Sequence, residues 1–206
     1  MPFFCFDGID GAGKTTQIKR FRDWLESQSM EVLLCRDPGT TALGEKLREL
    51  LLSHSDTPID MRAEMFLYMT ARVQLVEEVI RPALAAGKTV ISDRYLLANV
   101  VYQGHAGGLL PEQIWQVGKV ATDGILPELT FVLDLNPEAA AARRVGDPDR
   151  VEGRGDEFLR EVRDGFLREA KLREDIVIID ANASPDDVQA QIQSAASKRF
   201  ALGEQR

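Results

Sequence analysis

The sequence predicts an α/β fold in which five parallel strands form one sheet and helices cover both of its faces. Two observations support this prediction. Short apolar runs alternate along the chain with longer segments of helical periodicity, which is the pattern of repeated β-α units. The runs are apolar throughout, as expected for strands buried on both faces of a sheet. No internal repeat or low-complexity linker divides the 206 residues, so we expect a single domain over residues 1–206.

The elements follow in order from this pattern. We expect strands at 3–6, 32–35, 89–92, 129–133 and 176–179, and a helix over 64–74 among the intervening segments. The segment 143–156 is rich in Arg, Asp and Gly and has few apolar residues, which predicts a mobile surface flap. Cys5 and Cys35 fall inside two strands, where we expect buried free thiols and a reducing compartment. The tail 195–206 is predicted as a fraying helix end.

Composition limits the classes of function. The formal net charge is −8 and the isoelectric point is near 4.9, which argues against a basic surface for nucleic acid. Local clusters of arginine still allow small anionic ligands. The sequence opens without a signal peptide, and its apolar stretches are too short to cross a bilayer. We therefore expect a cytoplasmic protein without a membrane partner.

A phosphate-binding motif follows the first predicted strand. The residues Gly8-Ile9-Asp10-Gly11-Ala12-Gly13-Lys14-Thr15 match the P-loop pattern G-x-x-x-x-G-K-S/T, and a second threonine, Thr16, comes next. Glycines allow the backbone to wind so that N–H groups and the following helix N-terminus point at phosphate oxygens. We expect Lys14 to reach the β- and γ-phosphates and Thr15 to ligate Mg²⁺. The motif predicts binding of a nucleoside triphosphate and leaves the phosphate acceptor undefined.

Polar residues follow the next two strands, where ligands of an open parallel sheet bind. The second strand is followed by Arg36-Asp37-Pro38-Gly39 and the third by Asp93-Arg94-Tyr95. An acid at this position commonly supports Mg²⁺, and an arginine can hold phosphate through two parallel hydrogen bonds. The alternative interpretation of Asp93 and Arg94 is a structural ion pair at a loop.

The helix over 64–74 places Tyr68 and Arg72 four residues apart on one face. An aromatic ring can stack on a nucleobase while a guanidinium donates to its carbonyl group. On spacing alone, however, packing of Tyr68 in the core and solvation of Arg72 are the favoured interpretation.

Five segments in order resemble the bacterial thymidylate kinases over nearly the whole chain: FDGIDGAGKTTQ, RDPGTTALGEKLRELLL, FLYMTARVQ, SDRYLLANVVYQG and DRVEGRGDEFLREVRDGF. The resemblance implies a P-loop fold of the nucleoside monophosphate kinase kind. It also implies transfer of the γ-phosphate of ATP to dTMP with Mg²⁺, giving dTDP and ADP on the route to dTTP. The family further suggests a homodimer built on helices, for which the apolar stretch 65–80 is a candidate face, although core burial explains that stretch equally well.

The resemblance also implies roles for matched residues. Asp10 corresponds to the acid that contacts the sugar 3′-hydroxyl, Asp93 to the carboxylate linked to Mg²⁺, and Arg48 and Arg94 to the clamp on the acceptor phosphate. A tyrosine at position 102 is expected to disfavour a 2′-hydroxyl. The implied substrate-binding set is Asp10, Pro38, Arg48, Tyr68, Arg72, Arg94, Asn99, Tyr102 and Gln103.

The flap resembles the family's lid, with Asp149-Arg150-Val151-Glu152 matching D-R-x-E. The P-loop carries Ala12 where some family members carry arginine, and members of this kind supply the catalytic arginine from the lid. The lid candidates are Arg143, Arg144, Arg150 and Arg154, of which Arg143 and Arg144 have solvation of a helix end as the alternative. The implied catalytic set is Lys14, Asp10, Arg94, Arg150 and Arg144.

Three further positions depart from the family pattern. Asp7 stands where glutamate is more usual, and Asp37 replaces the glutamate of a Glu-Pro-Gly segment whose proline is typically cis. Ala98 replaces a serine of D-R-Y-x-x-S, which removes one polar contact near the acceptor. Two alternatives therefore stay open: a kinase for another nucleoside monophosphate such as dUMP, and a P-loop switch that binds nucleotide and signals to a partner.

Overall fold

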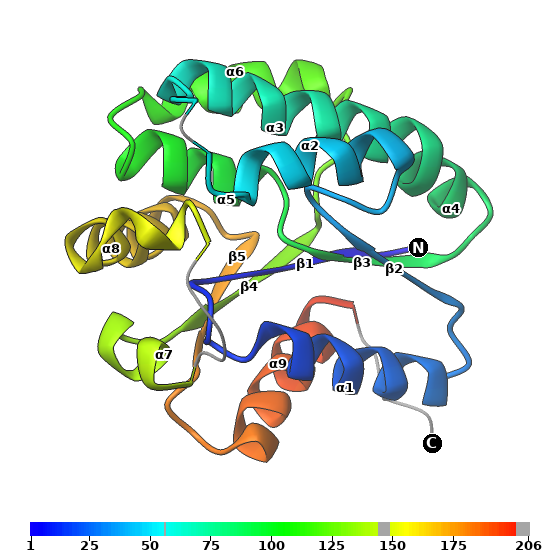
Figure 1. Cartoon of the computed structure of the whole chain (residues 1–206). Coiled ribbons are helices and arrows are strands. Elements are labelled where there is room, and N and C mark those ends of the chain that lie inside the picture. Colours follow the sequence, from blue (N-terminus) through cyan, green and yellow to red (C-terminus); the bar gives the residue numbers. More distant parts are fainter. Residues whose placement is uncertain (56, 144–148, 201–206) are drawn as a thin grey trace.

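The computed structural model describes residues 1–55, 57–143 and 149–200. Its centre is a parallel sheet with the strand order β2-β3-β1-β4-β5 (Figure 1). The strands are β1 (Phe3–Asp7), β2 (Val32–Arg36), β3 (Thr89–Asp93), β4 (Leu129–Asp134) and β5 (Ile176–Asp180). The predicted fold class is confirmed. Each strand runs one residue past its predicted end, because a charged residue closes every apolar run and still pairs in the ladder, as Arg36 does with Asp93.

Helices lie on both faces of the sheet (Figure 1). α1 (Lys14–Ser27) and α9 (Pro185–Phe200) cover one face, where the Phe4 ring meets the rings of Phe21 and Phe200. α3 (Met61–Leu75), α4 (Arg81–Ala85) and α6 (Pro111–Ala121) cover the other face, where Phe3 packs edge-on against Tyr95. Successive β1 residues thus point into two different cores, which explains why this run is apolar throughout.

The remaining elements connect these layers. They are α2 (Ala42–Leu52), α5 (Leu96–Asn99), α7 (Pro137–Arg143) and α8 (Asp156–Leu172), with the π-helical segments η1 (Val76–Ile80) and η2 (Val100–His105) and the short 3-10 helix η3 (Glu152–Arg154). α3 begins three residues before its predicted start, because the Asp60 side chain caps it by accepting a hydrogen bond from the Arg62 N–H. Residues 195–200 of the predicted tail form the last part of α9, which ends at Phe200, and residues 201–206 lie outside the described residues.

Both cysteines are buried and free, as expected from their position in strands. Among the described residues, no helix combines the length and apolar character needed to cross a membrane.

Candidate active site

The P-loop connects β1 to α1 through a backbone that only glycine fits at two points. Gly8 has φ 124° and lies so close to β4 that a Cβ would approach the Leu133 carbonyl oxygen to 2.5 Å. Gly11 has φ 89°, and a Cβ there would approach the Ala140 carbonyl oxygen of α7 to 2.4 Å. Both contacts are with backbone, which cannot move aside easily. These glycines therefore hold the loop against its neighbours and fix the direction in which its N–H groups point.

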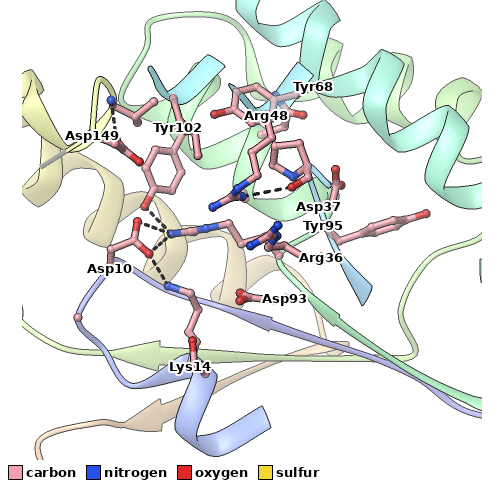
Figure 2. Close-up of a pocket in the computed structure, with 18 of the residues that line it drawn as sticks. Asp10, Lys14, Arg36, Asp37, Arg48, Tyr68, Asp93, Tyr95, Tyr102 and Asp149 are labelled. Atoms are coloured by element: carbon pink, nitrogen blue, oxygen red, sulfur yellow. Dashed lines mark hydrogen bonds and ion pairs between the residues drawn. The ribbon is translucent and has the colours of Figure 1, made fainter. Parts of the chain in front are cut away.

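Lys14 is nearly buried at the start of α1. Its Nζ donates hydrogen bonds to the carbonyl oxygens of Gly8 and Ile9, both at 3.0 Å, and to Oδ1 of Asp10 at 3.1 Å. The ammonium group therefore lies inside the loop that precedes it (Figure 2). A phosphate group in this loop would meet a positive charge that is already positioned.

Asp10 joins Lys14 to Arg94. Arg94 Nη2 donates to both carboxylate oxygens of Asp10, at 3.0 and 2.9 Å, and to the Tyr102 hydroxyl at 3.3 Å. Burial disfavours the charged carboxyl, but the positive charges of Arg94 and Lys14 outweigh it and hold the pKa of Asp10 below its usual range. Arg94 itself has φ 66°, a left-handed backbone that is costly for a residue with a side chain and is often found at functional sites.

Asp7 lies beneath this pair with its side chain fully buried. Its Oδ1 is 3.5 Å from Nη1 of Arg94, and the Cys5 thiol is 3.7 Å from its other oxygen. Burial raises the pKa of Asp7 to about 7, although the charges of Arg94 and Lys14 act in the opposite direction. The carboxyl is thus close to its titration point near neutral pH.

A second group of cations faces the P-loop across the cavity. Arg48 of α2 donates from Nη1 to the Pro38 carbonyl oxygen at 3.2 Å, and the Asp37–Pro38 peptide bond is cis, as the resemblance suggested. Burial and the nearby charges of Arg36 and Arg94 lower the pKa of Arg48. Guanidinium groups that repel one another in this way form a site to which an anion such as phosphate would bind favourably.

Beyond these arginines the cavity is lined by the predicted base-binding residues. Tyr68 is half-buried on its wall, whereas Arg72 is only 1% exposed. The interpretation from spacing alone, that Arg72 is solvated, is therefore wrong, and both residues of the set implied by the resemblance line the cavity. Arg72 Nε donates to Asp37 Oδ2 at 2.5 Å and Nη1 to Asn99 Oδ1 at 2.8 Å. A buried carboxylate on a neighbouring loop keeps the guanidinium inside the protein and directs it along the cavity wall.

Asp93 and Thr15 provide oxygen ligands at the floor of the cavity. Among the described residues, no group donates a hydrogen bond to the buried Oδ1 of Asp93. Both residues line the cavity beside the P-loop. A carboxylate and a hydroxyl oxygen are ligands that Mg²⁺ accepts, so the donor set fits this ion. The described residues hold no cluster of three or more side chains of the kind that would bind a metal without help from a ligand.

The predicted lid is described at Arg143 and from residue 149 onward; Arg144 lies outside the described residues. Arg143 lines the cavity and donates to the Ala181 carbonyl oxygen at 3.0 Å. Arg150 and Arg154 both donate a hydrogen bond to the carboxylate of Glu64 on α3, and neither is among the described residues that line the cavity. The catalytic role expected for Arg150 thus stays a prediction, and the structure places its guanidinium on a carboxylate that sequence reasoning did not single out.

One cavity of about 650 Å³ contains nearly all the predicted site residues. Every residue of the expected substrate-binding set lines it, together with the P-loop residues Asp10, Gly11, Gly13, Lys14, Thr15 and Thr16. Gly8, Ile9 and Ala12 of the predicted phosphate-binding set are not among its lining residues. Arg36, Asp37 and Asp149 also line it, although they were not members of the expected substrate-binding or catalytic sets.

Cations thus face a single cavity from two sides: Lys14 on the P-loop, and the arginines Arg36, Arg48 and Arg94. Such a site accommodates two phosphorylated ligands and transfer of a phosphoryl group between them. Among P-loop proteins, this arrangement defines the class of the nucleoside monophosphate kinases.

Comparison with known proteins identifies the family within this class. The sequence pattern of the thymidylate kinase family matches residues 6–192. The chain is 44% identical to the thymidylate kinase of Caldanaerobacter subterraneus over 86% of each chain, and 41% identical to that of Thermosipho africanus over 96% of this chain and 98% of that one. The crystal structure of thymidylate kinase from Ehrlichia chaffeensis superposes with a TM-score of 0.76 at 28% identity, covering 95% of this chain and 98% of that chain. The chain belongs to the thymidylate kinase family, an ATP-dependent group of phosphotransferases.

Proposed function

We propose that this protein transfers the γ-phosphoryl group of ATP to dTMP, producing dTDP and ADP for dTTP synthesis. The observation that carries this proposal is the single cavity with a P-loop at one end and an arginine cluster beside a buried Arg72–Asn99 pair at the other. Family membership supports ATP as the donor and dTMP as the acceptor.

The residues act by positioning and by charge neutralisation, because phosphoryl transfer requires little covalent work from the protein. Lys14 and the loop N–H groups hold the donor phosphates, while Arg48 and Arg94 hold the acceptor phosphate. Asp10 fixes Lys14 and Arg94 relative to each other through its two oxygens. The acceptor is an ionised phosphate oxygen, so the reaction needs no strong general base.

Thr15 and Asp93 would hold Mg²⁺ together with the donor phosphates. When bound, the ion supplies neutralisation of the negative charge on the phosphate oxygens. The buried Asp93 oxygen without a donor among the described residues supports this assignment. Burial of the base-binding residues supports exclusion of water from the acceptor, and the lid 143–156 is proposed to complete that exclusion.

We also propose a cytoplasmic homodimer. Two exposed apolar pairs, Leu43 with Leu50 on α2 and Phe66 with Val73 on α3, are each spaced seven residues apart and so lie on one side of their helix. α2 and α3 pack side by side (Figure 1). A second copy of the chain would bury this apolar surface.

A coupled assay of ADP release with ATP and Mg²⁺ tests the function, with dTMP, dUMP, dCMP, dGMP and UMP as acceptors. We expect a strong preference for dTMP. Since dUMP lacks only a methyl group and Ala98 removes a polar contact, dUMP should retain activity about 10- to 100-fold below dTMP. Preference for a different acceptor would contradict the base-binding roles of Tyr68, Arg72 and Asn99. Nucleotide binding without any saturable dTMP site would instead support a switch.

A further inference from the structure

Glu64, in the first turn of α3, has a carboxylate with no exposed surface. Its Oε2 accepts hydrogen bonds from Nη2 of Arg150 and from Nη2 of Arg154, each at 2.5 Å. Its Oε1 accepts a hydrogen bond from Nε2 of Gln103 at 2.8 Å. One buried side chain therefore contacts two arginines of the lid and one residue of the proposed base pocket.

The lid side of this contact is held by charge. A buried carboxylate that loses its positive partners is strongly destabilising, so Glu64 favours the arrangement in which Arg150 and Arg154 lie against it. Arg150 is fixed further, because its Nε donates to the Leu51 carbonyl oxygen at 2.6 Å and its backbone N–H to that of Leu52 at 3.1 Å. The lid residues around Arg150 and Arg154 are thus docked on the end of α2 and the start of α3.

The pocket side of the contact is a chain of two buried amides. Asn99 Nδ2 donates to Gln103 Oε1 at 2.7 Å, and Arg72 Nη1 donates to Asn99 Oδ1 at 2.8 Å. An ionised carboxylate only accepts hydrogen bonds and a guanidinium only donates them, so Glu64 and Arg72 at the two ends allow both amides a single orientation. The charges on Glu64 and Arg72 therefore together determine which amide groups Asn99 and Gln103 can offer to a base.

We propose that Glu64 is a positioning residue that couples docking of the lid to recognition of the acceptor base. The inference rests on the proposed base-binding roles of Asn99 and Gln103. Neither Glu64 nor Arg154 is among the described residues that line the cavity, and Glu64 meets the pocket through its hydrogen bond with Gln103, which does line it. Because coupling between two sites is reciprocal, dTMP in the pocket also stabilises the docked lid.

Two measurements on the full chain test the coupling: dTMP affinity by calorimetry, and amide hydrogen exchange over the lid residues 149–155 with and without dTMP. The variants are Glu64→Gln, which keeps the shape and removes the charge, and Arg154→Gln, which removes one lid partner. Glu169→Gln on α8 is the matched control, because the Glu169 carboxylate is also buried and lies outside the cavity lining that the structure describes. It accepts a hydrogen bond from Trp115 Nε1 at 3.1 Å and forms another with His105 Nε2 at 2.8 Å.

In the wild type, dTMP should slow exchange in the lid. Glu64→Gln and Arg154→Gln should each weaken dTMP binding by about fivefold or more and abolish the slowing, whereas Glu169→Gln should change neither. If Glu64 had only a structural role, Glu64→Gln would have a lower melting temperature, as Glu169→Gln would. Its dTMP affinity and the slowing of lid exchange by dTMP would then be as in the wild type.

Wild-type affinity and wild-type lid protection in both test variants would overturn the inference and leave the kinase function intact. Failure of the wild type to bind dTMP would overturn the proposed function and this inference with it. If Glu64→Gln does not fold, Arg154→Gln decides the question, because its Glu64 keeps Arg150 as a partner.

Discussion

Lys14 illustrates how one side chain serves the site through its position. It is 7% exposed and already bonded to two carbonyl oxygens of the loop that precedes it. Lys14→Ala removes this charge from the donor phosphates, so we expect kcat to fall by at least about 100-fold, as for loss of one preorganised donor to a transition state. The ADP-release assay measures the change. Lys19→Ala, on the exposed side of the same helix, is the control and should keep wild-type kcat.

Asp7 gives the residue-level prediction for pH. Burial raises its folded-state pKa to about 7 from 3.8, so between these values the folded protein binds a proton that the unfolded chain does not. The stabilisation from this bound proton is complete below the pKa of the unfolded state and is lost as pH rises through the pKa of the folded state. Relative to Asp7→Asn, the wild type should lose unfolding free energy as pH rises from about 5 to about 8, by at most about 1.4 kcal/mol per pH unit. Urea unfolding without nucleotide or metal measures the unfolding free energy of the wild type and of Asp7→Asn at each pH. If the two free energies change with pH in parallel, the raised pKa of Asp7 is contradicted.

Some features of the site residues could be predicted from the sequence and others could not. Spacing placed Tyr68 and Arg72 on one helix face, and both line the cavity. Burial of Arg72 was not predictable from spacing, because its partner Asp37 lies 35 residues away on another loop. Glu64 was missed for a similar reason: an acid in the first turn of a helix is ordinarily explained by the helix dipole, and its three partners are distant in sequence.

At the level of elements, α2 matters because it carries Arg48, for which we propose binding of the acceptor phosphate. Thr41 caps it, with Oγ1 accepting a hydrogen bond from the Gly44 N–H at 2.9 Å. Thr41→Ala should lower the free energy of unfolding by about 1 kcal/mol. Urea denaturation measures the loss. Thr70→Ala, an exposed threonine inside α3, is the comparison and should be neutral or slightly stabilising, since alanine is the better helix former. Equal losses in the two variants would contradict the capping role.

Element types were predictable and their ends were not. The apolar runs gave every strand of the sheet, because burial on both faces leaves a continuous signal. Ends depend on contacts that apolar periodicity does not contain. Asp60 caps α3 earlier than the periodicity begins, and Phe200 extends α9 because its ring packs 5.2 Å from that of Phe4, at the opposite end of the chain.

At the level of the whole molecule, the homodimer proposal predicts that a charge placed in the interface halves the mass of the particle in solution. Val73→Glu introduces a charge into the exposed apolar surface of α3, where Val73 is 42% exposed, and should produce a folded monomer. Sedimentation velocity distinguishes the two states. Leu172→Glu on α8, at a residue that is 77% exposed, should sediment as the wild type does. A wild type that is monomeric at micromolar concentration would rule out this interface.

The order of the strands also has a consequence for synthesis. β1 is made first, yet it pairs with β3 and β4, whose residues 89–93 and 129–134 leave the ribosome much later. Until then the aromatic run Phe3-Phe4-Cys5-Phe6 has no partner strand and remains a hazard for aggregation. The strand that leads into the phosphate loop can therefore pair on one edge only after residue 93 of the 206 has been made, and on its other edge only after residue 134.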